Sequence, residues 1–115
     1  MKITAVDVFP VQQFVYIKIS TDKDLYGIGE AYGSPGVGTK EQIEAIKPTL
    51  IGKNPLEIDV LYTGMRTDGS AHALMRAASG IEMALWDLAG KILGVPSTVL
   101  LGGKFRDSVR VYDHS

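Results

Sequence analysis

Alternating apolar and polar positions characterise the first third of the chain. Every second residue from 15 to 19 is a β-branched apolar residue, and the segments on either side are similarly rich in β-branched and aromatic residues. A period of two residues is typical of a half-buried strand, so we predict strands over residues 3–11, 14–21 and 25–32. The breaks between them are short and rich in turn-forming residues, which predicts a three-stranded antiparallel meander.

Two glycines interrupt the third predicted strand. Gly27 and Gly29 flank Ile28 and leave one face of the strand without side chains. Glycine inside a strand indicates either a bulge or the close approach of another backbone. We therefore expect one of these two arrangements beside the third strand.

Helical spacing and capping residues replace the alternation in the middle of the chain. Thr39 is predicted to cap a helix that starts at Lys40 and that Pro48 limits or kinks. Asn54 is predicted to cap a second helix, which runs to about Met65.

The longest periodic segment covers residues 71–93 and precedes Gly94 and Pro96, which are helix stop signals in the expected order. On a helical wheel one narrow core stripe contains Leu74, Ile81, Leu85, Leu88 and Ile92. A second stripe, about 100° away on the wheel, contains Met75, Trp86 and Leu93. One three-stranded sheet cannot cover both stripes, so we expect a further surface against this helix.

Composition restricts the class of protein. With 115 residues, 45% of them hydrophobic and 22% charged, the chain is one ordinary soluble domain. A complete eight-stranded α/β barrel needs about 250 residues. The net charge of −1 makes nucleic acid an unexpected partner, and the absence of cysteine excludes disulfides and zinc sites with thiolate ligands. No signal-peptide core or membrane-length apolar run is present, so we expect a cytoplasmic protein that is not bound to membranes.

The end of the chain predicts that more protein follows. Residues 109–112 have the alternation of a strand, but no later element is available to pair with it. We therefore expect residues 1–94 to form one domain. Residues 95–115 would then form a linker and the first strand of a truncated barrel.

Five sequence motifs, in this order and at these spacings, resemble one known family. They are GIGEA at 27–31, IKP at 46–48 with LIGKNP at 50–55, SGIEMALWDLAGK at 79–91, LLGG at 100–103 and RD at 106–107. Together they are similar to the amino-terminal domain of the mandelate racemase and muconate lactonizing enzyme group of the enolase superfamily. The resemblance implies an α+β capping domain, a three-stranded antiparallel meander followed by a helical bundle, packed over the mouth of a TIM-type barrel.

The resemblance also implies a reaction and a cofactor. Enzymes of this group bind Mg²⁺ through carboxylates of the barrel, and they abstract the α-proton of a carboxylic acid substrate. The outcome is racemization, cycloisomerization or loss of water, as in an acid-sugar dehydratase. The metal ligands and bases of the family would come after Ser115, so no residue of this chain inherits a catalytic or metal-binding role. The implied partners are a small carboxylic acid, the carboxyl-terminal barrel and further copies in a homo-oligomer.

Two segments of this chain match the substrate-capping loops of the family by position. They are the turn after the first strand and the loop after Glu30, and their candidate residues are Gln12, Gln13, Phe14, Tyr32, Ser34, Pro35 and Val37. Tyr112 and His114 would lie at the carboxyl end of the first barrel strand, where such barrels bind substrate. These two residues are therefore possible substrate contacts in a longer enzyme.

Other titratable residues have structural interpretations. Glu30 has no paired carboxylate near it in the sequence, and we expect it to be structural. Glu82 lies beside the second stripe, and we expect it to form an ion pair. Asp87 and Lys91 are four residues apart and are predicted to form a surface pair. His72 lacks a second ligand at metal-binding spacing.

Two alternative functions remain open from the residues alone. The first is a free-standing interaction module that uses the second stripe to dimerise. The second is a nucleotide-binding loop at residues 33–40, which differ from the phosphate-loop pattern only by exchange of the last two residues. That exchange displaces both functional side chains, and a meander is not the parallel sheet that such loops need.

Overall fold

The computed structural model describes residues 1–33, 38–66 and 71–113, and side chains are described in the last range from Met75 onward. A three-stranded sheet is followed by helices. The elements are β1 (Ile3–Val11), β2 (Phe14–Thr21), β3 (Tyr26–Tyr32), α1 (Thr39–Leu50), α2 (Ile58–Arg66), α3 (Ala71–Leu93) and α4 (Ser97–Leu100). The predicted α+β class and the bounds of the first two strands and the long helix are confirmed.

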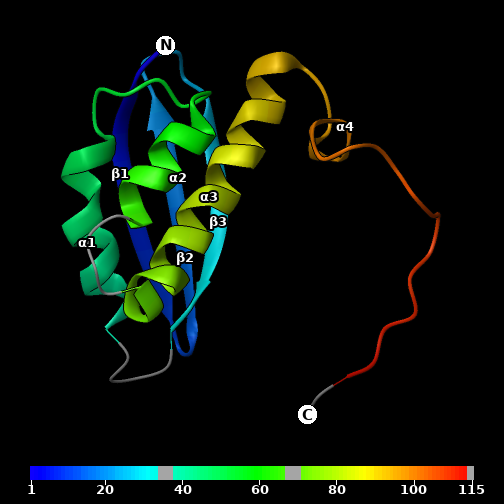
Figure 1. Ribbon diagram of the computed structural model, residues 1–115, viewed down its shortest axis with the longest axis horizontal. Helices are drawn as coiled ribbons and strands as arrows, with labels where there is room; N and C mark the ends of the chain where they lie inside the picture. The colour runs from blue at the N-terminus through cyan, green and yellow to red at the C-terminus, as the bar shows by residue number, and fades with distance from the viewer. Residues whose placement is uncertain (34–37, 67–70, 114–115) are drawn as a thin grey trace.

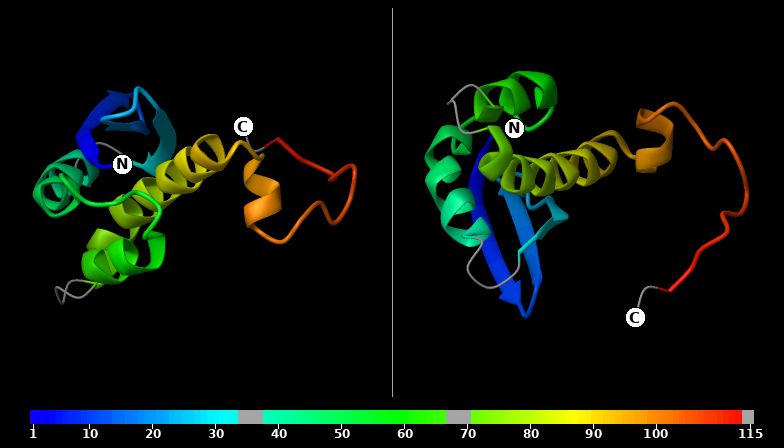
Figure 2. Two further views of the ribbon diagram at one scale, coloured as in Figure 1. Left: turned by 90° about the horizontal axis from the view of Figure 1, so that it is seen from above. Right: turned by 60° about the horizontal axis from the view of Figure 1, so that its bottom comes forward.

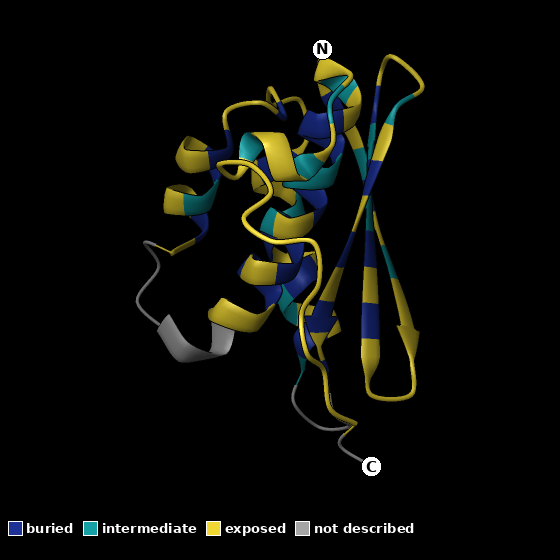
Figure 3. Cartoon of the chain, turned by 90° about the vertical axis from the view of Figure 1, so that its right-hand side faces the viewer, coloured by how far each residue is buried: buried dark blue, intermediate teal, exposed yellow. Residues whose placement is uncertain are grey.

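The sheet is an antiparallel meander in the order β1, β2, β3. All helices that pack on it lie against one face, and its other face has no described element over it (Figure 2). Alternate residues are therefore buried and more exposed along β2 and β3, as Figure 3 shows. The inward residues Val15, Ile17 and Ile19 are buried, which confirms the alternation read from the sequence.

Helix α3 packs closely against β3, and the two glycines of β3 permit that contact. A Cβ atom on Gly29 would overlap the carbonyl oxygen of Gly80, and one on Gly27 would overlap that of Ala84. The pairing of β2 with β3 has no register shift, so of the two predicted arrangements the close backbone approach is the one that forms. The core stripe of α3 faces this contact, with Ile81, Leu85 and Leu88 fully buried.

The start of α1 differs from the prediction. Thr39 is the first residue of the helix and not its cap, because its buried hydroxyl donates to the carbonyl oxygen of Tyr32 at 2.8 Å. Gly38 precedes the helix in the left-handed conformation, with φ of 78°, and its carbonyl accepts from the amide of Gln42. Pro48 lies inside α1, which ends two residues later, so the predicted limit is confirmed.

The start of α2 and the tail also differ from the prediction. The Asn54 side chain accepts from the amide of Leu56 in a local turn, and the helix begins only at Ile58. After α4, which was not predicted, residues 103–113 form no strand. No described segment lies beside residues 109–112 to pair with them, and a strand requires such a partner.

Candidate functional site

The two predicted capping segments lie at the same end of the sheet. The turn between β1 and β2 and the chain that leaves β3 both emerge at the lower end of Figure 1. The amide of Gly33 donates to the carbonyl oxygen of Gln13 at 3.1 Å and so joins the two segments. Gln12, on the turn, has a left-handed φ of 57°, which a two-residue hairpin turn of this kind requires.

A hollow of about 470 Å³ lies at this end of the sheet. It is lined by Gln13, Phe14, Glu30, Ala31, Tyr32 and Met83. The structure therefore brings together three of the predicted capping residues, one from the turn, one from the start of β2 and one from the end of β3. Met83 was missed by the sequence analysis, although it lies only three residues before Trp86, at the margin of the second stripe.

The remaining predicted site residues do not line this hollow. Gln12 is exposed on the turn, and Tyr112 is 89% exposed on the tail. The other candidates, Ser34, Pro35, Val37 and His114, lie outside the described residues.

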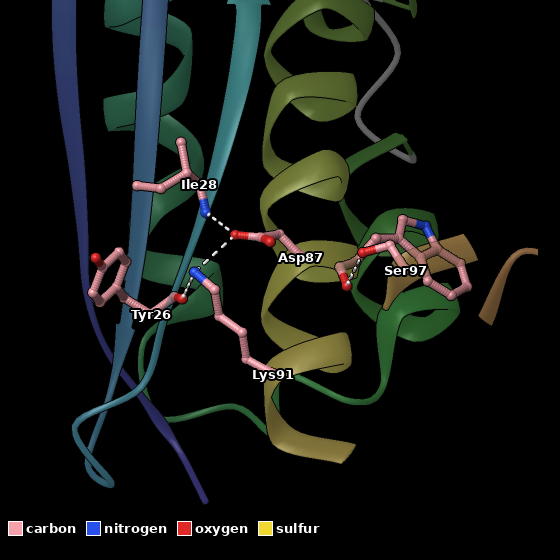
Figure 4. Close-up of polar contacts among 6 residues, drawn as sticks. Tyr26, Ile28, Asp87, Lys91 and Ser97 are labelled. Atoms are coloured by element: carbon pink, nitrogen blue, oxygen red, sulfur yellow. Dashed lines mark hydrogen bonds and ion pairs between the residues drawn. The ribbon is translucent and has the colours of Figure 1, made fainter. Parts of the chain in front are cut away.

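Side chains of α3 hold the outer edge of β3 in place. Asp87 accepts from the backbone amide of Ile28 at 2.8 Å, and Lys91 donates to the carbonyl oxygen of Tyr26 at 2.8 Å (Figure 4). The two side chains also form the predicted ion pair, at 3.1 Å. The pair thus satisfies backbone groups of an edge strand, which a purely solvated surface pair would not do.

The same face of α3 continues toward the capping end. Arg76 lies eleven residues before Asp87, and its guanidinium carbon is 5.3 Å from the centre of the Tyr32 ring. Met83 lies between them and is 52% exposed. Met83 therefore lines the hollow from a position on α3 between Arg76, which contacts Tyr32, and Asp87, which binds the Ile28 amide.

The predicted ion pair of Glu82 does not form. Its carboxylate accepts from the indole N–H of Trp86 at 3.2 Å, and among the described residues it has no cationic partner. Both groups belong to one turn of α3, so this local bond satisfies them without a distant partner. Ser97, at the start of α4, donates to the carbonyl oxygen of Trp86 at 3.5 Å (Figure 4).

The second stripe of α3 remains open to solvent. Met75 is 39% exposed, Leu93 is 55% exposed and Trp86 is half-buried. Two apolar grooves of about 390 and 410 Å³ run beside this stripe, the first against α2 and α4 and the second against Ile28 and Leu101. The expectation that this chain does not cover both stripes is confirmed.

Among the described residues, one carboxyl group has a clearly shifted pKa. The backbone amide of Lys2 donates to Asp22 at 2.9 Å and lowers the pKa of that carboxyl, at the opposite end of the sheet from the hollow. Within the described ranges no three His, Asp or Glu side chains are grouped as a metal site would require. Residues 33–40 follow a strand of an antiparallel meander, which is not the context of a phosphate loop. The described helices include none long and apolar enough to cross a membrane.

The antiparallel meander backed by helices on one face is the fold of the amino-terminal domains of the enolase superfamily, as solved structures of that class show. The chain belongs to the mandelate racemase / muconate lactonizing enzyme, N-terminal domain family, whose model matches residues 2–102. The family resemblance expected from the five motifs is thereby confirmed.

Relatives and solved structures agree with this assignment. A D-xylonate dehydratase of Haloferax volcanii is 47% identical over 104 residues, which cover 86% of this chain and 25% of the relative. A D-mannonate dehydratase of Novosphingobium aromaticivorans is 37% identical, covering 100% of this chain and 31% of the relative. A mandelate racemase/muconate lactonizing enzyme-like protein of Rubrobacter xylanophilus has a TM-score of 0.87 and 40% identity, over 96% of this chain and 30% of that one. The chain thus spans between a quarter and a third of the length of these relatives.

Proposed function

We propose that this chain is the substrate-capping domain of an enzyme that acts on a sugar acid, by loss of water or a related α-proton reaction. One observation carries the proposal: the two predicted capping segments are bonded to each other and line a single hollow with Met83. The names of the relatives, which include D-xylonate and D-mannonate dehydratases, support a sugar acid as the substrate.

The open surface of α3 supports a division of the chain into two parts. Residues 1–94 would form the capping domain, and residues 95–115 would lead into a carboxyl-terminal barrel as a linker and first strand. A barrel against α3 would cover the exposed side chains of Met75, Met83 and Leu93. Burial of apolar surface at about 25 cal/mol per Å² would stabilise that contact.

The residues at the hollow suit the recognition of a polyhydroxylated acid. Phe14 and Met83 are apolar and would exclude water when the hollow closes over a substrate. Gln13 and Tyr32 can each donate and accept hydrogen bonds, as binding of sugar hydroxyls requires. Magnesium, which the family resemblance implies, would polarise the substrate carboxylate in the barrel. The described residues offer no cluster to hold it, and we assign this chain no step through the metal.

A pair of equally exposed side chains provides the test. Phe14 lies at the hollow and Ile51 lies at the other end of the sheet, after α1, and each is 39% exposed. In the full-length enzyme, assayed with magnesium and a panel of sugar acids, we expect Phe14→Ala to lower kcat/KM about tenfold or to change the preferred acid. Ile51→Ala should leave the kinetics unchanged. Equal kinetics for the two variants would contradict a capping role, as would sugar-acid turnover by the 115-residue chain alone.

A free-standing dimerising module is the second candidate function. The exposure of Met75 and Leu93 favours it, because a partner could bury them as well as a barrel could. Light scattering measures the mass of the 115-residue chain and of its Leu93→Glu variant, and so distinguishes the dimerising module from the capping domain. A stable dimer that Leu93→Glu dissociates would favour the module, whereas a dimer unaffected by this variant would leave α3 available for a barrel.

A further inference from the structure

Helix α3 places a cation on a tyrosine ring at each end of β3. The guanidinium carbon of Arg76 is 5.3 Å from the centre of the Tyr32 ring. The ammonium nitrogen of Lys91 is 4.4 Å from the centre of the Tyr26 ring, but Lys91 is also bonded to Asp87 and to the backbone of β3. Within the described ranges the guanidinium of Arg76 has no carboxylate partner. The Tyr32 ring is therefore the contact that its position has to explain.

The backbone on both sides of the Tyr32 side chain is held by other elements. The buried hydroxyl of Thr39 donates to the carbonyl oxygen of Tyr32 at 2.8 Å. The amide of the next residue, Gly33, donates to the carbonyl oxygen of Gln13 at 3.1 Å. These bonds fix the backbone, whereas contacts of the ring decide which rotamer the side chain adopts, and Tyr32 is 58% exposed.

Arg76 lies on a helix whose position against β3 is fixed. It is one turn before Gly80, whose carbonyl oxygen would overlap a Cβ atom on Gly29. The two residues that follow Arg76, Ala77 and Ala78, are fully buried. Such close packing leaves the helix little room to shift. The guanidinium therefore extends from a fixed point of the backbone to the end of β3, where Tyr32 borders the hollow.

We infer that Arg76 is a positioning residue of the capping site, which holds the Tyr32 ring in its place at the hollow. This role rests on the proposed capping function. A cation over an exposed aromatic ring shifts the equilibrium between ring positions by about two- to fivefold. A substrate that contacts the ring loses affinity in proportion to the time that the ring spends elsewhere. Arg76 thus acts through Tyr32 and need not touch the substrate.

Kinetics of the full-length enzyme test this role, with magnesium and the panel of sugar acids used for Phe14→Ala. Arg76→Ala should raise KM about fivefold, the upper end of that range because the hollow excludes water when it closes, and should leave kcat unchanged. Arg76→Lys keeps a cation within reach of the ring and should restore most of the affinity. Arg66→Ala is the matched control. Arg66 is also exposed and lies 5.5 Å from the centre of the Tyr62 ring, but neither residue lines the hollow, so KM should not change.

A double-mutant cycle distinguishes positioning of the ring from attraction of the substrate anion by the charge of Arg76. In Tyr32→Phe, which keeps the ring, Arg76→Ala should still raise KM. In Tyr32→Leu, which lacks the ring, Arg76→Ala should have no further effect. An undiminished rise of KM in Tyr32→Leu would overturn the inference, as would a lower kcat at constant KM or an equal effect of Arg66→Ala.

The ring contact is also measured without substrate, on the 115-residue chain. The aromatic proton resonances of Tyr32 should shift in Arg76→Ala and not in Arg66→Ala, and circular dichroism establishes that each variant is folded. Arg76→Gln replaces Arg76→Ala should the latter fail to fold. Unchanged Tyr32 resonances would remove the contact and the inference with it. Shifted resonances with an unchanged KM would overturn the positioning role alone, because the kinetics of Phe14→Ala test the capping role separately.

Discussion

Helix α3 has two sides that differ in how completely this chain covers them. On the side of the sheet, Gly80 and Ala84 lie so close to β3 that no Cβ fits on Gly27 or Gly29. On the other side, Met83 and Leu93 are more than half exposed beside open grooves. The chain therefore specifies the first contact by itself, and its described residues leave the second side open to solvent.

The contrast indicates how stability and function are divided within one helix. Close packing of backbone on backbone tolerates no added atom, since protein interiors are packed as densely as organic crystals. An exposed apolar side chain contributes little to the stability of the isolated chain, yet it supplies binding energy when a partner covers it. Substitutions on the two sides should therefore differ greatly in their effect on folding.

The largest expected effect is that of one methyl group at the closest contact. Gly29→Ala should lower the free energy of unfolding by about 3 kcal/mol, because the new Cβ overlaps a backbone oxygen that cannot move independently of α3. Gly64→Ala introduces the same group where nothing lies within 4 Å and should raise stability by up to about 1 kcal/mol. Urea unfolding monitored by circular dichroism compares them. A loss below about 1 kcal/mol for Gly29→Ala would refute the close approach.

Two apolar residues of α3 test the contrast directly. Leu85 is fully buried and Met83 is 52% exposed, two positions apart on one helix. Leu85→Ala should destabilise the chain by about 2 to 3 kcal/mol, and Met83→Ala by no more than about 0.5 kcal/mol. Thermal and urea unfolding of both variants give the two values. If Met83→Ala were as costly as Leu85→Ala, the outer side of α3 would already be covered in solution.

The sequence predicted the fold where a single physical signal dominates. The alternation over 14–21 and the apolar stripes over 71–93 predict a strand and a helix whose bounds match the structure. The match is close because burial of one face determines both elements. The helix starts were less accurate. Thr39 and Asn54 both have side chains that can cap, but their hydrogen bonds go to Tyr32 and to a local turn. Such side chains can pair with several backbone groups, Thr39 as a donor and Asn54 as an acceptor, and helix propensity does not select among these groups.

The candidate site was predictable only in part for a related reason. Position in the chain was enough to select Gln13, Phe14 and Tyr32, which the structure places at one hollow. Met83 also lines the hollow, but it lies on a helix more than fifty residues later in the chain. Local residue spacing cannot predict such a long-range contact. The contact of Asp87 with Ile28 was missed likewise, since the i to i+4 rule predicts its pairing with Lys91 but not the edge strand beneath them.

The smallest expected effect concerns this edge contact. Asp87→Asn removes the charge from both the bond with the Ile28 amide and the pair with Lys91, in a side chain that is 37% exposed. Solvent screening limits the loss to about 0.5 to 1 kcal/mol. Asp107→Asn, in the exposed pair with Lys104 on the tail, should cost nothing measurable. Urea unfolding at low and high salt measures both, and identical behaviour would mean that the Asp87 pair does not hold β3 against α3.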